Sequence, residues 1–240
     1  DWAFPEICTG EPCEGWEYNS VDNYIRDRKN VTVDIKLVST ESGKILNNST
    51  HWVAGVYWRD QDEQLLRQQT GEPNFSSNFD TTNSAIYGQL DTQLSDALTL
   101  TSGLRFEQRS ADYIDSEAVA HNVDESLWGG RIALNYQHSD QTMVYGLISR
   151  GYKAGGVNSE PDLSAEDREF DTELMWNFEA GVKGSWLDSR LDTQIAAFYQ
   201  QRKDIQIKQS LTQKREDSNA VDFTDYFGNS AGGSNYGLEV

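Results

Sequence analysis

The sequence lacks any run of apolar residues long enough for a transmembrane helix, which needs about 18 to 20 such residues. Hydrophobic residues make up 37% of the 240-residue chain, and the mean hydropathy is −0.69. A helical membrane protein is therefore excluded. A transmembrane β-barrel is not excluded, because its strands alternate apolar and polar residues and their average is hydrophilic.

Positive charge is also scarce. The chain has 20 lysine and arginine residues against 39 aspartate and glutamate residues, which gives a net charge of −19. A nucleic-acid partner is excluded on this ground, since phosphate binding needs a basic surface. Only four prolines are present while aromatic residues reach 11%, so a disordered chain is not expected either.

Motifs of catalysis are missing as well. The chain contains no nucleophile elbow, no zinc-protease motif and no phosphate-binding loop. The three histidines, His51, His121 and His138, are scattered along the sequence and do not form a metal-binding pattern. We therefore expect no enzymatic activity, no metal site and no cofactor.

The two cysteines, Cys8 and Cys13, stand close together with Gly10 and Pro12 between them. This spacing favours a small disulfide-closed loop in an oxidising compartment. A pair of free thiols is the alternative.

The main positive signal is alternation of apolar and polar residues at every second position, which is typical of strands with two different faces. In the segment 98–107, for example, Leu98, Leu100, Leu104 and Phe106 share one face. We predict nine strands, which cover residues 31–38, 51–59, 86–94, 98–107, 127–137, 142–150, 178–186, 191–200 and 234–240.

The connections between these strands alternate between short and long. Short or medium turns are predicted at 39–48, 95–96, 139–141 and 188–189, and long polar loops at 60–83, 108–126, 151–173 and 203–232. In an up-and-down meander, all short turns then lie at one end and all long loops at the other. Outer-membrane barrels have this arrangement, with short periplasmic turns and longer extracellular loops.

The predicted fold is thus all-β, an antiparallel up-and-down transmembrane β-barrel. Residues 1–30 are expected to form an extracellular loop with the disulfide, and residues 31–240 a partial barrel. Nine strands is an odd number, and the alternation at 234–240 runs to the last residue, so we expect a fragment of a larger barrel.

Several motifs carry a family resemblance. They are Tyr145-Gly-Leu-Ile-Ser-Arg-Gly-Tyr-Lys-Ala-Gly-Gly-Val-Asn158, then Asn177-Phe-Glu-Ala-Gly-Val-Lys-Gly-Ser-Trp-Leu187, Lys203-Asp-Ile-Gln206, and the closing Asn235-Tyr-Gly-Leu-Glu-Val240. Their order and spacing resemble the barrel of TonB-dependent outer-membrane receptors. Upstream, the segments 51–58 and 85–106 resemble barrel strands of the same family, so the resemblance covers about residues 31–240.

The resemblance implies a 22-stranded barrel that surrounds an N-terminal plug domain, located in the bacterial outer membrane. Members import scarce ligands, most often ferric siderophores, with energy supplied through TonB, ExbB and ExbD. The expected partners are this energy-coupling complex, reached through a region upstream, a small metal chelate, and outer-membrane lipid including lipopolysaccharide. A passive porin-like channel and a soluble β-sandwich that binds carbohydrate are the alternatives.

Two groups of residues are candidate ligand contacts. Trp2, Trp16 and Tyr18, together with Tyr24, are aromatic residues of the predicted N-terminal loop that could stack on a ligand. Alternatively, they pack the small core of that loop.

Arg150, Tyr152 and Lys153 form the second group, at the end of a predicted strand, where a cation could meet an anionic ferric chelate. The alternative is that the glycines at 151, 155 and 156 only allow a sharp turn.

The segment 160–173 is rich in acidic residues. A site for Ca²⁺ or for a cationic ligand is one interpretation, although the spacing does not match an EF-hand loop. We favour a solvated acidic loop that faces lipopolysaccharide through divalent cations.

Overall fold

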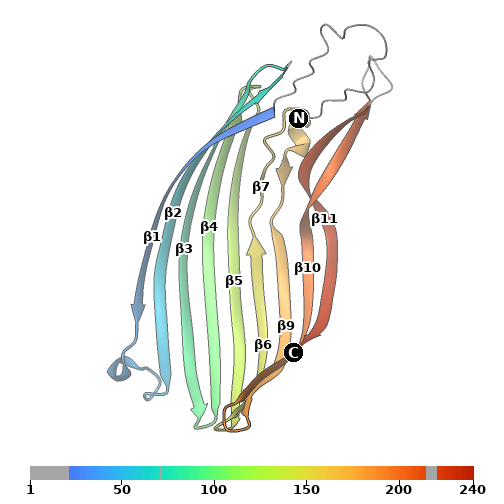
Figure 1. Ribbon diagram of the computed structural model, residues 1–240. Helices are drawn as coiled ribbons and strands as arrows, with labels where there is room; N and C mark the ends of the chain where they lie inside the picture. Colours follow the sequence, from blue (N-terminus) through green and yellow to red (C-terminus); the bar gives the residue numbers. More distant parts are fainter. Residues whose placement is uncertain (1–21, 71, 215–220) are drawn as a thin grey trace.

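The computed structural model describes residues 22–70, 72–214 and 221–240, and most of them belong to one antiparallel sheet (Figure 1). Each of its nine strands pairs with the next along the chain, in the order β1-β2-β3-β4-β5-β6-β9-β10-β11. The nine predicted strands and the up-and-down topology are confirmed. The strands are β1 (Asp22–Val38), β2 (Thr50–Gln69), β3 (Phe75–Ser95), β4 (Leu98–Asp115), β5 (Ala120–Ser139), β6 (Thr142–Lys153), β9 (Glu173–Trp186), β10 (Leu191–Lys214) and β11 (Val221–Glu239).

The remaining elements are short. A 3-10 turn, η1 (Glu41–Gly43), lies between β1 and β2, and the connection from β6 to β9 contains β7 (Gly156–Val157), η2 (Ala165–Asp167) and β8 (Glu169–Phe170). Within the described residues, no helix is long and apolar enough to cross a membrane.

The predicted short turns are present, but three of the four predicted long loops are wrong. Residues 60–83, 108–126 and 203–232 lie largely in strands, so that only four residues join β4 to β5 and the connection at 151–173 alone is long. In the same way β1 already begins at Asp22, within the predicted loop 1–30. On β2–β4 the convex face of these strand ends is mostly polar and the concave face mixes polar and apolar residues, so the regular apolar alternation stops there. The backbone pairing continues, for example between Asp60 and Thr82.

The N-terminal part of the predicted loop lies outside the described residues. The proposed disulfide between Cys8 and Cys13 and the aromatic residues Trp2, Trp16 and Tyr18 are therefore still predictions.

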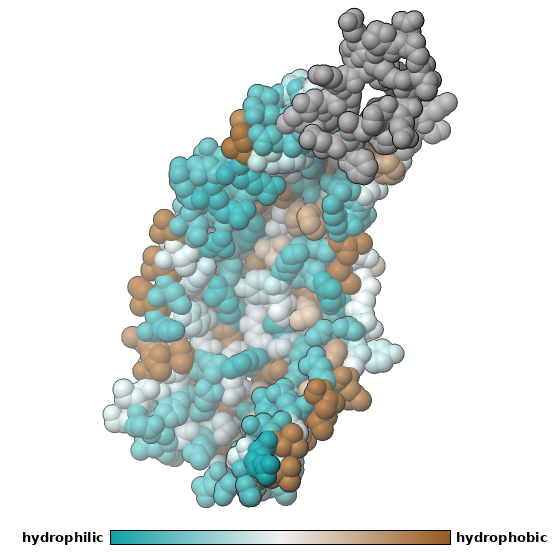
Figure 2. Space-filling model, in the orientation of Figure 1, coloured by the Kyte–Doolittle hydropathy of each residue, from teal (hydrophilic) through white to brown (hydrophobic). Residues whose placement is uncertain are grey.

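One face of the sheet carries a band of exposed apolar side chains. Five of these side chains lie side by side on neighbouring strands, and each is between 39% and 62% exposed. They are Ile35, Val56, Ile86, Phe106 and Trp128. Hydrophobic side chains also gather at mid-height on the edges of the molecule in Figure 2, between hydrophilic ends. Such a continuous apolar surface is unfavourable in water and suits the hydrocarbon layer of a membrane.

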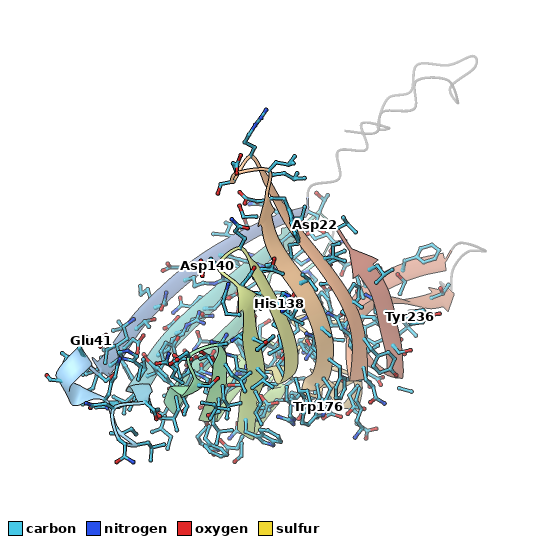
Figure 3. The ribbon with its side chains drawn as sticks, turned by 90° about the horizontal axis from the view of Figure 1, so that it is seen from below. Asp22, Glu41, His138, Asp140, Trp176 and Tyr236 are labelled. Atoms are coloured by element: carbon cyan, nitrogen blue, oxygen red, sulfur yellow. The ribbon has the colours of Figure 1, made fainter. Side chains whose placement is uncertain are left out.

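The sheet is curved, and Trp176, which shares a face with the apolar band, lies on its convex side (Figure 3). At the end of the band away from the short turns, aromatic residues are frequent, as in the interfacial girdles of outer-membrane barrels. They include Trp58, Phe106, Trp128, Trp176, Phe178, Tyr199 and Tyr236.

Beyond this aromatic end, the convex face becomes acidic. Asp62, Asp80 and Asp112 are direct cross-strand partners on β2, β3 and β4. Partial burial together with the neighbouring Asp62 and Asp112 raises the pKa of Asp80. The row of like charges therefore destabilises the sheet whenever Asp80 is ionised.

We predict that Asp80→Asn stabilises the barrel by about 0.2–1 kcal/mol at neutral pH, because it removes the central charge of the row. Since the folded-state pKa of Asp80 is raised, the repulsion is present above that pKa and fades as acid protonates the carboxyl group. The gain in thermal unfolding temperature should therefore disappear at low pH and shrink in high salt. Asp124→Asn is the matched control, because Asp124 lies opposite Ser110 and no carboxylate. An equal gain in both variants would contradict the explanation.

Candidate functional site

Two glycines allow the long connection between β6 and β9 to pack closely against itself. A side chain at Gly155 would place its Cβ atom 2.5 Å from the carbonyl oxygen of Phe170, and one at Gly156 would lie 2.7 Å from the Phe170 ring. Only glycine allows such a close approach of β7 to β8. The predicted sharp turn at these glycines is not found: Gly151 lies within β6 and Gly156 within β7, and no turn occurs over residues 151–157.

Arg168 anchors this connection to β4. Its side chain is 1% exposed and forms ion pairs with Asp115, whose side chain is fully buried, and with Glu117 at 2.8 Å. It also donates to the carbonyl oxygens of Pro161 and Leu163. A buried charge needs such complete pairing, since an unpaired one is strongly destabilising.

Tyr113 completes this anchor. Its hydroxyl group donates to Asp115 Oδ2 at 3.0 Å. Burial, assisted by the nearby Asp115 carboxylate, raises the pKa of Tyr113 to about 12, so the hydroxyl group keeps its proton and stays a donor at neutral pH.

On its other side, the connection is bound to β10 and β11. Buried Asn158 accepts from the backbone N–H of Phe227 and donates to the carbonyl oxygens of Phe227 and Arg168. Gln206 donates to the carbonyl oxygens of Lys153, Ala154 and Asp171. The connection therefore joins strands that are far apart in the sheet.

A pocket of about 480 Å³ lies where this connection meets the strands β1–β3 and β10–β11. It is at the end of the sheet away from the short turns. Its walls combine aromatic rings with charged groups, and they include Tyr24, Phe79, Phe170, Tyr226, Phe227, Arg26, Glu63, Glu160, Lys208 and Asp225. We refer to it as the concave pocket.

Most charges around the concave pocket are paired. Glu63 binds Arg28 at 2.6 Å, Asp225 binds Lys208 at 2.6 Å, and Glu160 binds Arg67 at 3.1 Å. Burial raises the pKa of Glu160, although Arg67 opposes this shift. Paired charges beside aromatic walls suit a ligand that has both conjugated rings and polar groups.

Among the described residues, no three histidine, cysteine, aspartate or glutamate side chains are grouped to hold a metal ion. A larger depression, of about 880 Å³, is lined mainly by residues of the apolar band such as Trp52, Ile86 and Leu104. Because these side chains belong to the predicted lipid-facing surface, we do not regard that depression as a ligand site.

The three candidate residues at the end of β6 lie in different places. Arg150 is on the convex face, with its guanidinium group 3.9 Å from the ring centroid of Trp128. The Tyr152 hydroxyl group donates to Glu107 on β4 at 2.9 Å, and Lys153 lies 5.9 Å from the Phe227 ring of the concave pocket. Of the three, Lys153 is nearest to the pocket, and Arg150 points away from it.

The favoured interpretation of the acidic segment 160–173 as a solvated loop is wrong in part. Glu160 forms an ion pair with Arg67, and Arg168 is buried. Glu173 is also buried, and its carboxylate accepts hydrogen bonds from Arg202 Nε at 2.7 Å and from the backbone N–H of Gln206 at 2.9 Å. The segment is held against the sheet by partners distant in sequence, which no local pattern indicates.

The sequence also failed to indicate most of the pocket. The segments predicted to be loops contain Phe79, Tyr226, Phe227 and Lys208, and Tyr24 alone belongs to the predicted aromatic contacts. Their positions follow from the register of the extended β3, β10 and β11, and no local sequence pattern gives that register.

A comparison with protein families agrees with this geometry. The model of the family described as "TonB dependent receptor-like, beta-barrel" matches residues 10–240. The chain belongs to the TonB-dependent receptors. Its nine-stranded antiparallel sheet is part of the wall of a receptor barrel, and barrels of this family are outer-membrane proteins.

Similar sequences and structures agree with this assignment. The chain is 29% identical to the pesticin receptor of Yersinia pestis over 145 residues, which is 57% of this chain and 21% of that protein. It is 30% identical to the pesticin receptor of Yersinia enterocolitica over 132 residues, which is 51% of this chain and 19% of that protein. The chain thus spans about a fifth of the length of these curated relatives.

The fold is similar to that of the ferric yersiniabactin uptake receptor FyuA from Yersinia pestis. The TM-score is 0.70 at 19% identity, with 91% of this chain and 33% of that chain covered. For BauA, the ferric preacinetobactin receptor from Acinetobacter baumannii, the TM-score is 0.57 at 16% identity, with 90% and 34% covered.

We predict that Asp115→Asn releases the connection at 154–172, because it leaves buried Arg168 without its fully buried partner. Loss of one member of such a pair costs about 3 kcal/mol, so amide hydrogen exchange in the connection should accelerate roughly 100-fold. Glu117→Gln is the matched control. The Glu117 side chain is 46% exposed, and its loss should change exchange by less than about fivefold. Unchanged exchange in Asp115→Asn would contradict the anchoring role.

Proposed function

We propose that this chain supplies barrel wall and ligand-binding surface to a TonB-dependent importer of a metal chelate, most specifically a ferric siderophore. The observation that carries the proposal is the concave pocket, which combines aromatic walls and paired charges at the end of the sheet away from the short turns. In the proposed membrane orientation this end is extracellular, where a ligand would arrive.

The chemistry of the pocket favours an organic chelate over a simple anion. The chain has a net charge of −19, so a small anion is repelled at long range. At short range, Arg26 and Lys208 offer donors, while rings such as Phe170 and Phe227, 6.1 Å apart, offer apolar contact. The ferric-siderophore uptake named for FyuA and BauA supports the same choice.

The wider assembly is part of this proposal. We place the protein in the bacterial outer membrane, with the nine-stranded sheet in the barrel wall. Energy would come from TonB with ExbB and ExbD, through a plug domain outside this chain. Outer-membrane lipid, including lipopolysaccharide, would surround the convex face.

Neither alternative fits as well. A soluble β-sandwich that binds carbohydrate would leave the apolar band facing water. A passive channel needs an open lumen, whereas the connection at 154–172 is bound across the concave side by buried contacts of Arg168 and Asn158. An importer uses this bound segment as part of a ligand site.

We predict that Phe227→Ala in the complete receptor weakens binding of the imported ferric chelate about tenfold, because one aromatic wall of the pocket is lost. The backbone contacts of Phe227 with Asn158 do not need the ring and should persist. The dissociation constant can be measured on the purified receptor, and growth on the chelate under iron limitation reports uptake.

Phe223→Ala is the matched control on the same strand. Phe223 is 69% exposed and does not line the pocket, so the variant should bind as the parent does. If the complete receptor binds and imports no ferric chelate of any class, the proposed ligand is wrong. If Phe223→Ala and Phe227→Ala weaken binding equally, the pocket is wrong.

A further inference from the structure

Arg150 is a cation placed on the lipid-facing side of the sheet. Its backbone pairs with Gly130 on β5 and with Trp176 on β9, two residues of the convex face. Ile148 lies two residues before Arg150 on the same face of β6, and it continues the apolar band toward the short turns. Arg150 therefore lies where the hydrocarbon layer ends and lipid headgroups begin.

Among the residues that the structure describes, no carboxylate pairs with this cation. The Arg150 side chain donates to the carbonyl oxygen of Trp128 and lies over the Trp128 ring at 3.9 Å. Stacking on an aromatic ring holds the guanidinium plane in place and leaves its remaining N–H groups available.

Aromatic rings extend the surface beside Arg150. Trp128 meets Trp176 edge to face with 6.2 Å between centroids, Trp176 stacks on Phe178 at 6.4 Å, and Phe178 contacts Tyr199 at 6.3 Å. Trp176 lies on the outer rim of the curved sheet (Figure 3). Aromatic residues with this placement border the headgroup layer.

A groove with a second cation lies next to this aromatic surface. It has a volume of about 540 Å³, and its lining includes Trp176, Tyr199, Gln201, Lys203 and Ser234. The Lys203 side chain is 72% exposed, with Asp204 at 3.5 Å. From strand spacing and rise, the Cα atoms of Arg150 and Lys203 are about 12 Å apart.

We propose that this part of the convex face, formed by Arg150, the aromatic rings beside it and the groove that Lys203 lines, binds the phosphate-bearing headgroup of an outer-leaflet glycolipid in the proposed membrane orientation. The two cations bind phosphate oxygens, and the sugar lies on the aromatic rings. The acyl chains lie along the apolar band, in contact with Ile148 and Phe178.

The charge pattern of the convex face favours this position for an anionic lipid. Above the band on β2–β4, the row of Asp62, Asp80 and Asp112 repels phosphate. On β6–β10, Arg150 and Lys203 attract it. A free anion would not need the aromatic edge or the apolar band below, whereas a lipid uses both.

The test is a titration of the complete receptor in detergent with lipid A, a glycolipid that carries two phosphates, with bound lipid counted by native mass spectrometry. Arg150→Gln and Lys203→Gln should each weaken the apparent affinity about fivefold, and the double variant roughly 25-fold. Dephosphorylated lipid A should bind the parent as weakly as intact lipid A binds the double variant.

Two matched controls remove a charge elsewhere. Arg131→Gln lies on the opposite face, where Arg131 donates to Gln89, and Lys29→Gln is an exposed cation of β1 away from the groove. Both should bind lipid A as the parent does. A heat-dependent gel shift verifies that each barrel is folded.

Three results would overturn the proposal. They are unchanged lipid A binding in the double variant, equal losses in the two controls, and displacement of lipid A by millimolar inorganic phosphate, which would indicate a site for the free anion. Because Lys203 is largely exposed, its variant keeps the test valid if the Arg150 variant folds poorly.

Discussion

Hydrogen bonding between neighbouring strands is the constraint on which the rest of this structure depends. A strand that crosses hydrocarbon must satisfy all its backbone groups with its neighbours, and here the same pairing continues past the apolar band. The register is fixed by the band, because a slip of one residue would turn each apolar side chain to the concave side. The polar strand ends inherit that register, and so do the residues of the concave pocket.

The two faces of the sheet therefore have different chemistry from the same strands. The convex face provides the apolar band and the aromatic residues at its edge, and beyond them the surface divides into an acidic part on β2–β4 and a cationic part on β6–β10. The concave face provides polar side chains that bind the connection at 154–172. Arg168 and Asn158 fix this connection by contacts to strands on both of its sides, so the pocket has one wall that is not part of the sheet.

The strands within the band could be predicted from the sequence, because residues such as Leu104 and Phe106 alternate there with Arg105 and Glu107. The strand ends could not be predicted, because polar residues such as Asp60 and Thr82 replace the apolar ones on the convex face and remove the regular alternation. The candidate site was harder still. Arg168 lies in an acidic run, and its partner Asp115 is 53 residues away, so only the folded structure shows that it is buried. The charge of Arg150 predicts a ligand contact, but its actual position depends on the side of β6 from which it projects, where it stacks on Trp128.

On β4 the convex face meets lipid only as far as Phe106, whereas the strand continues beyond the membrane to Asp115. A scan of single cysteines at positions 98–114 tests it, in the complete receptor without its native cysteines, with spin labels probed by oxygen and by a water-soluble nickel complex. We predict that spin labels at even positions from 98 to 106 are more accessible to oxygen than to the nickel complex. From 108 onward, labels at even positions should be accessible to the nickel complex, and labels at odd positions should be accessible to it or shielded from both reagents by the bound connection. Preference for oxygen at even positions up to 114, or no alternation below 106, would contradict the account.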